Sequence, residues 1–132
     1  MKNVKHIKIL GFGDPNLLGD ANHIEKLINE LINRVNMQPL GNTVIYNVPL
    51  EIEKLGRDLF EDEGGITTQL VGFSTLSTSH VAIHTWPLRS EFHLDLYSCR
   101  FFSDEDVINF IIDTLQTTDL KVSDLSFACE WG

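Results

Sequence analysis

A serine, two histidines and a thiol lie close together in the sequence, and these residue types could do chemistry. Ser79, His80 and His84 fall within six residues, and Cys99 follows fifteen residues after His84. A hydroxyl or thiol beside an imidazole can act as a nucleophile, and imidazoles four residues apart on a helix can bind a metal ion. The segment is therefore the candidate reactive centre of the chain.

The pattern around these residues predicts a β-hairpin. Residues 79–85 and 93–99 are rich in Val, Ile, Leu and Tyr, and Trp86-Pro87 with a polar turn joins them. If the turn is centred near residue 89 or 90, Cys99 faces His80 and lies beside Ser79. Alternation along the second strand then gives one polar face, formed by His93, Asp95, Tyr97 and Cys99.

The spacing of Ser79 and His84 places a condition on this geometry. Strict alternation puts residues that are five apart on opposite faces of a regular strand. A bend or a strand end at Ser79 is therefore required if both side chains serve one site.

Three interpretations of the cluster stay open on spacing alone. His80 and His84 could bind zinc, although Val81 and Ile83 favour a strand and no third ligand has a recognisable spacing. Cys99 could be a nucleophile that a histidine activates. Alternatively, these residues are only the satisfied polar side chains of a hairpin.

Two amphipathic helices and about six short strands must position the segment. Apolar residues recur with helical spacing from Ile24 to Val35, and Asn22 with Glu25 forms a capping-box-like pair at the start. A second helix opens at Ser103. The predicted strands are residues 4–10, 43–48, 69–76, 79–85, 93–99 and 125–131. This pattern predicts an α+β two-layer sandwich, in which a mostly antiparallel sheet has two helices packed on one face.

Composition narrows the class of protein further. The chain has 132 residues, which predicts a single domain over residues 1–132. Its net charge of −9 should repel nucleic acid and anionic membranes. No apolar run approaches the length of about 18 residues that a membrane span needs, and the first residues lack the features of a signal peptide. Cys99 and Cys129 form no CxxC pair, so we expect free thiols in a cytoplasmic protein.

A longer pattern resembles a known family. The chain contains Ser79-His80-x-x-Ile83-His84-Thr85-Trp86-Pro87 and then Asp95-x-Tyr97-x-Cys99. These residues, and the spacings between them, resemble the prokaryotic S-adenosylmethionine decarboxylases, which are pyruvoyl enzymes of polyamine and spermidine synthesis. The N-terminal run His6-Ile7-Lys8-Ile9-Leu10-x-Phe12-x-Asp14 is similar to the family's first strand in order and spacing.

The resemblance implies a self-made cofactor and no metal. Ser79 would be the pyruvoyl precursor, His84 the processing histidine and Cys99 the proton donor. Cleavage between Thr78 and Ser79 would give a β chain of residues 1–78 and an α chain of residues 79–132 that begins with the pyruvoyl group. This ketone would form a Schiff base with a small, amino-acid-type substrate. The resemblance also implies a homodimer, because the family completes its pocket from two protomers.

Several positions depart from the family pattern. Thr78 replaces a glutamate that usually precedes the serine, and Leu88 replaces the glutamate that holds the ribose hydroxyls of the substrate. Leucine cannot accept those hydrogen bonds. Glu91 is a candidate replacement, and together with Trp86, Leu88 and Phe60 it is expected to line the substrate site.

These departures keep alternatives to S-adenosylmethionine decarboxylation open. Leu88 suits a pyruvoyl-dependent ornithine or arginine decarboxylase, which needs no ribose contact. Thr78 and the altered turn also fit an unprocessed, non-catalytic homologue that acts as a partner protein.

Overall fold

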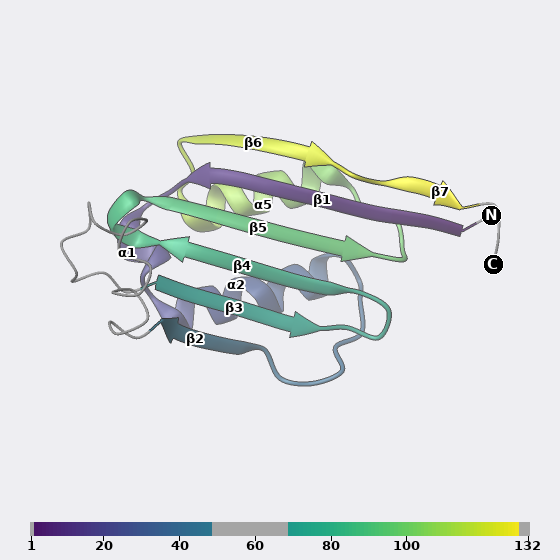
Figure 1. The fold of residues 1–132 in the computed structure, drawn as a ribbon, viewed down its shortest axis with the longest axis horizontal. Coiled ribbons are helices and arrows are strands. Elements are labelled where there is room, and N and C mark those ends of the chain that lie inside the picture. Colours follow the sequence, from purple (N-terminus) through teal and green to yellow (C-terminus); the bar gives the residue numbers. More distant parts are fainter. Residues whose placement is uncertain (1, 49–68, 130–132) are drawn as a thin grey trace.

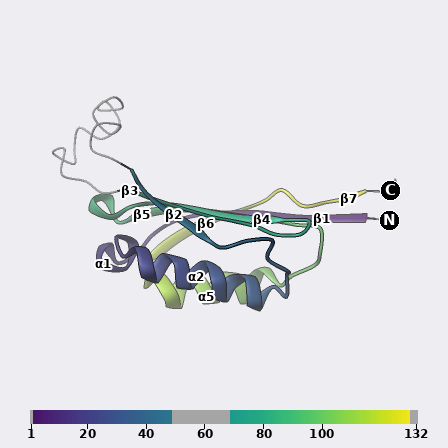
Figure 2. The ribbon, with the colours of Figure 1, turned by 90° about the horizontal axis from the view of Figure 1, so that it is seen from below.

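An antiparallel sheet with helices on one of its faces forms the part of the chain that the structure, a computed structural model, describes: residues 2–48 and 69–129 (Figures 1 and 2). The strands follow the order β2-β3-β4-β5-β1-β6, and β7 pairs with the beginning of β1. They are β1 (Lys2–Phe12), β2 (Val44–Val48), β3 (Gln69–Thr75), β4 (His80–Trp86), β5 (Glu91–Ser98), β6 (Asp119–Asp124) and β7 (Phe127–Cys129). The helices are α1 (Pro15–Leu18), α2 (Ala21–Arg34) and α5 (Asp104–Leu115), with a 3₁₀ turn η2 (Pro87–Arg89).

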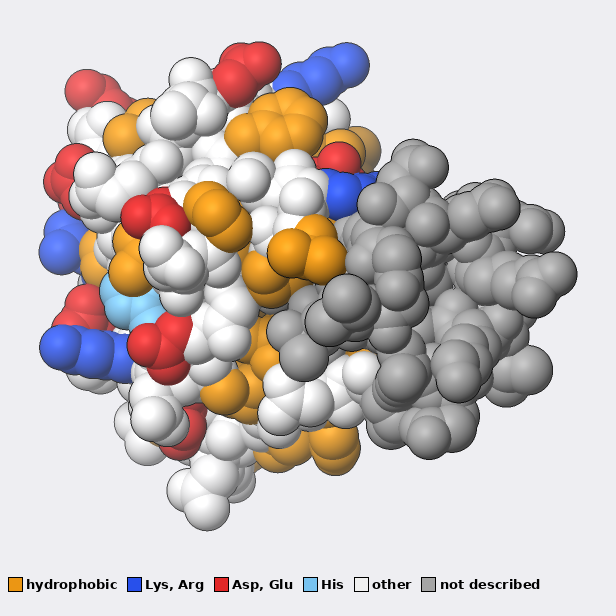
Figure 3. Space-filling view, turned by 90° about the vertical axis from the view of Figure 1, so that its left-hand side faces the viewer, with side chains coloured by type: hydrophobic (Ala, Val, Ile, Leu, Met, Phe, Trp, Pro, Cys, Tyr) orange, Lys and Arg blue, Asp and Glu red, His pale blue; other side chains and the backbone are white. Residues whose placement is uncertain are grey.

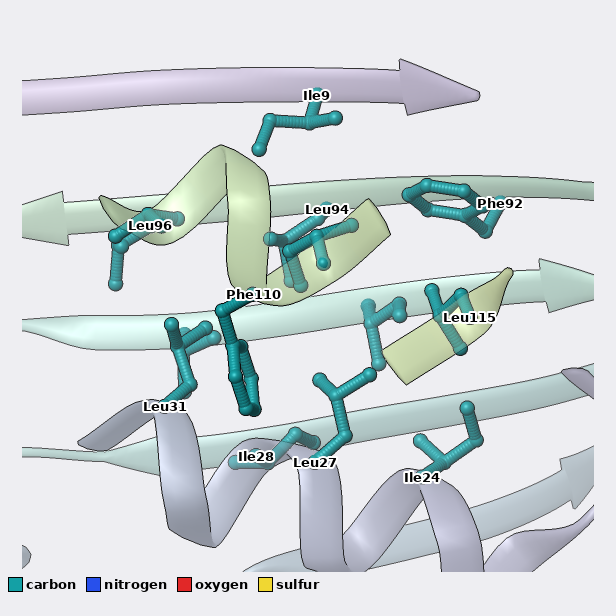
Figure 4. Packing of buried hydrophobic residues seen from close by; sticks show 14 of the residues in the cluster. Ile9, Ile24, Leu27, Ile28, Leu31, Phe92, Leu94, Leu96, Phe110 and Leu115 are labelled. Carbon is teal, nitrogen blue, oxygen red and sulfur yellow. The ribbon is translucent and has the colours of Figure 1, made fainter. Parts of the chain in front are cut away.

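The hydrophobic core lies between the sheet and the two long helices. Apolar residues at every second position of the strands point toward α2 and α5, as the alternating burial of β4 and β5 shows. The fully or almost fully buried residues include Ile9, Ile24, Leu27, Ile28, Leu31, Phe92, Leu94, Leu96 and Leu115 (Figure 4). The predicted α+β sandwich, with both long helices on one face, is confirmed.

The helix ends agree with the sequence at α5 and differ from it at α2. Ser103 caps α5 by accepting a hydrogen bond from the Asp106 N–H. The predicted pairing of Asn22 with Glu25 is wrong, because the helix begins earlier: the Asp20 carboxylate accepts from the Asn22 and His23 N–H groups.

Two elements were not predicted, and one is shorter than predicted. A single turn of helix, α1, begins at Pro15 shortly after the end of β1, and β6 adds an edge strand beside β1. Strand β6 has only two apolar residues, the half-buried Leu120 and Val122, so the sequence shows little hydrophobic alternation there. The last strand spans only Phe127–Cys129 among the described residues. No helix in the described ranges is long and apolar enough to cross a membrane.

The β4–β5 hairpin forms with a register shifted from the prediction. His80 pairs with Tyr97, and Trp86 pairs with Glu91, so Cys99 does not face His80. The cause is the short connection: Pro87 begins a 3₁₀ turn and Ser90 closes it in the left-handed conformation, with φ 53°. This turn is centred earlier than residue 89, so the partner of every β4 residue moves by two positions and the alternation of faces is kept.

Candidate active site

The face of the sheet opposite the helices carries the candidate site. In the described part of the chain no helix covers this face, which we call the open face (Figure 2). Its side chains alternate with the core residues of the same strands, as predicted for β5. They include His6 from β1, His80, His84 and Trp86 from β4, and Glu91, His93, Asp95 and Tyr97 from β5.

Ser79 and Cys99 meet at one end of this face. Ser79 lies just before β4, and its carbonyl accepts a hydrogen bond of 2.9 Å from the Leu76 N–H across a tight turn. The strand end that the spacing required is therefore present. The Cys99 N–H donates to the Ser79 Oγ at 3.3 Å, and the Cys99 thiol is free and exposed. The predicted contact between residues 79 and 99 forms despite the changed register, with Thr78 exposed beside it.

His84 lies far from Ser79 of the same chain. Five residues of extended strand place their Cα atoms about 16 Å apart. The neighbours of His84 are His93, which is its cross-strand partner, and Trp86, whose ring stacks on it with 6.0 Å between centroids. Desolvation by partial burial, and then the charge of His93, hold the pKa of His84 below its ordinary value. A neutral imidazole that can accept a proton is therefore favoured near neutral pH.

Trp86 is the centre of a polar cluster at the opposite end of the face. The ring centroids of Trp86 and His93 lie 4.7 Å apart in an edge-to-face arrangement, and the Arg89 guanidinium lies 5.7 Å from the Trp86 centroid. Glu91 accepts hydrogen bonds from His93 at 3.0 Å and from Arg89 at 3.4 Å. Leu88 is 60% exposed in η2. The structure therefore gathers Trp86, Leu88 and Glu91 at one end of the sheet and Ser79 with Cys99 at the other.

A hollow of about 400 Å³ adjoins the Trp86 cluster, at the end of β5 away from Cys99. Viewed from this end, exposed hydrophobic side chains lie among charged and other polar ones (Figure 3). Phe12, at 45% exposure, combines with charged groups in the wall of the hollow. The lining residues include Leu10, Phe12, Glu91, His93, Asp119 and Lys121.

Asp95 links two histidines beside Ser79. Its Oδ1 lies 2.8 Å from His6 Nε2 and its Oδ2 lies 3.0 Å from His80 Nε2. Partial burial acts to raise the pKa of Asp95, but the hydrogen bonds and charges of His6 and His80 together hold it below its usual value. In the described ranges, no three His, Cys, Asp or Glu side chains are grouped so that they could hold a metal ion.

Comparison with known proteins decides the family. A sequence profile described as S-adenosylmethionine decarboxylase matches residues 7–126 of this chain. The chain belongs to the S-adenosylmethionine decarboxylase family.

Two proenzymes similar to this S-adenosylmethionine decarboxylase family member come from archaea. The S-adenosylmethionine decarboxylase proenzyme of Pyrococcus horikoshii is 25% identical over 118 residues, which cover 89% of this chain and 72% of the relative. That of Pyrobaculum arsenaticum is 26% identical over 110 residues, covering 83% and 74%. The chain is therefore similar to proenzymes over most of its length.

A solved structure shares the fold of this family member. The adenosylmethionine decarboxylase of Aquifex aeolicus superposes with a TM-score of 0.68 at 17% identity, covering 93% of this chain and 88% of the other. The likeness supports the sandwich architecture, with the sheet and helices arranged as described above.

Two features of this family member were missed by reasoning from the sequence. Neither the Asp95 link to His6 and His80 nor the approach of His93 to His84 was predicted. The second follows from the hairpin register alone and could have been found with the correct turn. The first also needs the register of β1 on β5, which no local pattern specifies. Phe60 lies outside the described residues.

Proposed function

We propose that this member of the S-adenosylmethionine decarboxylase family is a self-processing, pyruvoyl-dependent carboxy-lyase. Its substrate would be S-adenosylmethionine and its product the decarboxylated aminopropyl donor for spermidine synthesis in the cytoplasm. The observation that carries the proposal is the contact between Ser79 and Cys99 at a strand end, in a chain whose relatives are named proenzymes. Those names favour S-adenosylmethionine over ornithine or arginine.

Self-cleavage would begin at the turn before β4. The Ser79 Oγ attacks the carbonyl carbon of Thr78, so that an ester replaces the peptide bond and the nitrogen of residue 79 becomes an amine. Removal of the Ser79 α-proton then breaks the ester C–O bond and releases residues 1–78 with a carboxylate at Thr78. The unsaturated residue that is left takes up water and loses ammonia to give the pyruvoyl group. Ser79 suits this role because it lies outside the regular strand.

Decarboxylation would then occur at the new N-terminus. The pyruvoyl group supplies a carbonyl that captures the substrate amine and accepts the electron pair left when carbon dioxide departs. The exposed Cys99 thiol lies beside residue 79 and is placed to return a proton to the α-carbon. Both groups are held by the backbone at one end of the open face.

The position of His84 supports a homodimer. Because His84 lies about 16 Å along β4 from its own Ser79, we assign its processing role to the site of a second protomer. Packing of two open faces would bring the middle of one sheet near the end of the other. It would also cover exposed apolar side chains of that face, such as Phe73 at 40% and Tyr46 at 62% exposure.

The Trp86 end of the partner would supply the contacts to the nucleoside. Leu88 cannot accept hydrogen bonds from ribose, whereas Glu91 has an ordered carboxylate close by. We therefore assign ribose recognition to Glu91 and packing against the substrate to Trp86 and Leu88. Stacking by Phe60 stays a prediction.

Intact mass spectrometry of the purified protein tests the proposal. We expect two chains of about 9 and about 6 kDa, in proportion to 78 and 54 residues, with the smaller one blocked at its N-terminus. Ser79→Ala should remain a single chain of 15.0 kDa. Ser77→Ala, a change of the same kind in the same turn, should cleave normally. A wild-type protein that stays whole under every condition contradicts self-processing and favours the partner-protein alternative.

A further inference from the structure

Asp95 lies at the centre of a cluster that joins three strands immediately beside Ser79. Its two carboxylate oxygens are divided between His6 on β1, at 2.8 Å, and His80 on β4, at 3.0 Å. An ionised carboxylate only accepts hydrogen bonds, so each histidine donates through Nε2–H. The side chains of Asp95, His6 and His80 are 28%, 22% and 38% exposed, so the cluster is shielded without being sealed from water.

Aromatic rings fix the same cluster from both sides. The His80 ring lies between Tyr97, at 5.4 Å and an angle of 9°, and Phe73, at 6.2 Å and 24°. The ring centroids of His6 and Tyr97 lie 5.5 Å apart in an edge-to-face arrangement. His80 is therefore held by a hydrogen bond at its tip and by stacking on both faces, which leaves it few alternative rotamers.

His80 is the first residue of β4 and is bonded directly to Ser79. Cleavage before Ser79 would turn this position into a chain end, and chain ends fray unless they are tied down. The cleavage would also separate His6, in residues 1–78, from His80 and Asp95, in residues 79–132.

We propose that Asp95 is a positioning residue that clamps His80 to His6, and so keeps residue 79 beside Cys99 both before and after cleavage. The inference rests on the proposed function for its catalytic consequence, whereas the clamp itself exists in the uncleaved chain. Asp95 touches neither the scissile bond nor the substrate in this scheme. Its effect passes through His80 and one peptide unit.

The test compares Asp95→Asn with Asp124→Asn. Asp124 is an exposed acid on β6 whose carboxylate accepts from the Ser126 N–H, a bond that an asparagine oxygen can also accept, so its variant removes the same charge and leaves both histidine bonds of Asp95 in place. A small misplacement of a reacting group costs up to about a hundredfold in rate. We expect Asp95→Asn to slow self-cleavage and to lower the kcat of the processed enzyme at least about tenfold, with KM changed less than about twofold. Asp124→Asn should match the wild type in all three.

A second variant and a local probe separate positioning from folding. His6→Ala removes one arm of the clamp and leaves the other, so its loss of rate should be smaller than that of Asp95→Asn. Amide hydrogen exchange should accelerate in Asp95→Asn at residues 80 and 97–99, while exchange in α2 stays unchanged. A uniform acceleration through the whole chain instead means a structural role and overturns the clamp.

The outcomes distinguish this inference from the proposed function. If the wild type cleaves and Asp95→Asn cleaves at the same rate within about twofold, the clamp is wrong and the function stands. If the wild type does not cleave, the proposed function is wrong. Amide hydrogen exchange in the intact chain still tests whether Asp95 clamps His80. In that case, unchanged protection at residue 80 in Asp95→Asn overturns the clamp.

Discussion

The two faces of the sheet are built from the same strands and differ completely in character. Toward the helices, β4 and β5 present Val81, Ile83, Phe92, Leu94 and Leu96, which are at most 2% exposed. On the open face, the residues between them are histidines, acids, Tyr97, Trp86 and the small Ala82. Every second residue therefore serves stability, and the residues between serve the site.

This division explains how chemistry is placed on a small chain. The covered face fixes the backbone of both strands, so side chains on the other face are held at strand positions without helping to fill the core. Changes on the covered face should therefore lower the free energy of unfolding. Changes on the open face should alter the rate or its pH dependence and leave the fold intact.

Removing a large core side chain from the covered face should cause the largest loss in the free energy of unfolding. Phe92 is fully buried, and Phe92→Ala should lower the free energy of unfolding by about 4 kcal/mol. Phe73→Ala removes the same atoms from the open face, where the ring is 40% exposed, and should cost less than about 1 kcal/mol. Denaturant unfolding measures both. Equal losses of unfolding free energy in the two variants would mean that the open face contributes as much to stability as the covered face.

Removing the thiol should lower the rate of decarboxylation and leave the free energy of unfolding almost unchanged. Cys99 is exposed, so Cys99→Ala should leave the free energy of unfolding within about 0.5 kcal/mol of the wild type. The loss of a general acid should lower the rate of decarboxylation about a hundredfold. The rate of carbon dioxide release per processed chain measures this. Undiminished release would exclude Cys99 as the proton donor.

Adding one methyl group to the covered face should have a smaller effect. A Cβ on Gly72 would lie 2.8 Å from Ile28 Cδ1 and 2.9 Å from Ile45 Cδ1, so Gly72→Ala should cost about 2 kcal/mol. Gly41→Ala makes the same change with no atom within 4 Å and should stay within about 0.5 kcal/mol. Thermal unfolding of the two variants checks the difference. If Gly72→Ala is as stable as the wild type, the core side chains near Gly72 can move aside at little cost.

The smallest effect should be a shift in pH dependence on the open face. Desolvation and then the charge of His93 lower the pKa of His84, so the neutral imidazole persists to lower pH. Without His93, protonation of His84 becomes easier, and the acidic limb of the self-cleavage profile should move to higher pH. His93→Ala and His93→Gln should shift alike if charge is the cause. At pH 7.5 their rates should stay within about threefold of the wild type. A limb that is unmoved, or that moves to lower pH, contradicts the coupling.

The sequence predicted the parts of this molecule that depend on periodicity. The apolar stripe from Ile24 to Val35 and the alternation along 93–99 correctly assigned α2, β5 and the two faces. The contact of Ser79 with Cys99 was also predicted, although from a register that is wrong by two residues, and it forms because both residues lie at the same end of the hairpin.

What the sequence did not predict depends on a single turn or on long-range register. The hairpin register was wrong by two residues because Pro87 and Ser90 form a turn that composition alone does not specify. The link from Asp95 to His6 spans 89 residues of sequence and exists only because β1 lies next to β5. Strand β6 was missed because it is an edge strand with few apolar residues.

Release of labelled carbon dioxide tests the central claim most directly. The processed protein would be supplied in turn with carboxyl-labelled S-adenosylmethionine, ornithine and arginine, with the uncleaved Ser79→Ala protein as the blank. We expect release from S-adenosylmethionine and none above the blank from the two plain amino acids. Release from ornithine or arginine but not from S-adenosylmethionine would contradict it.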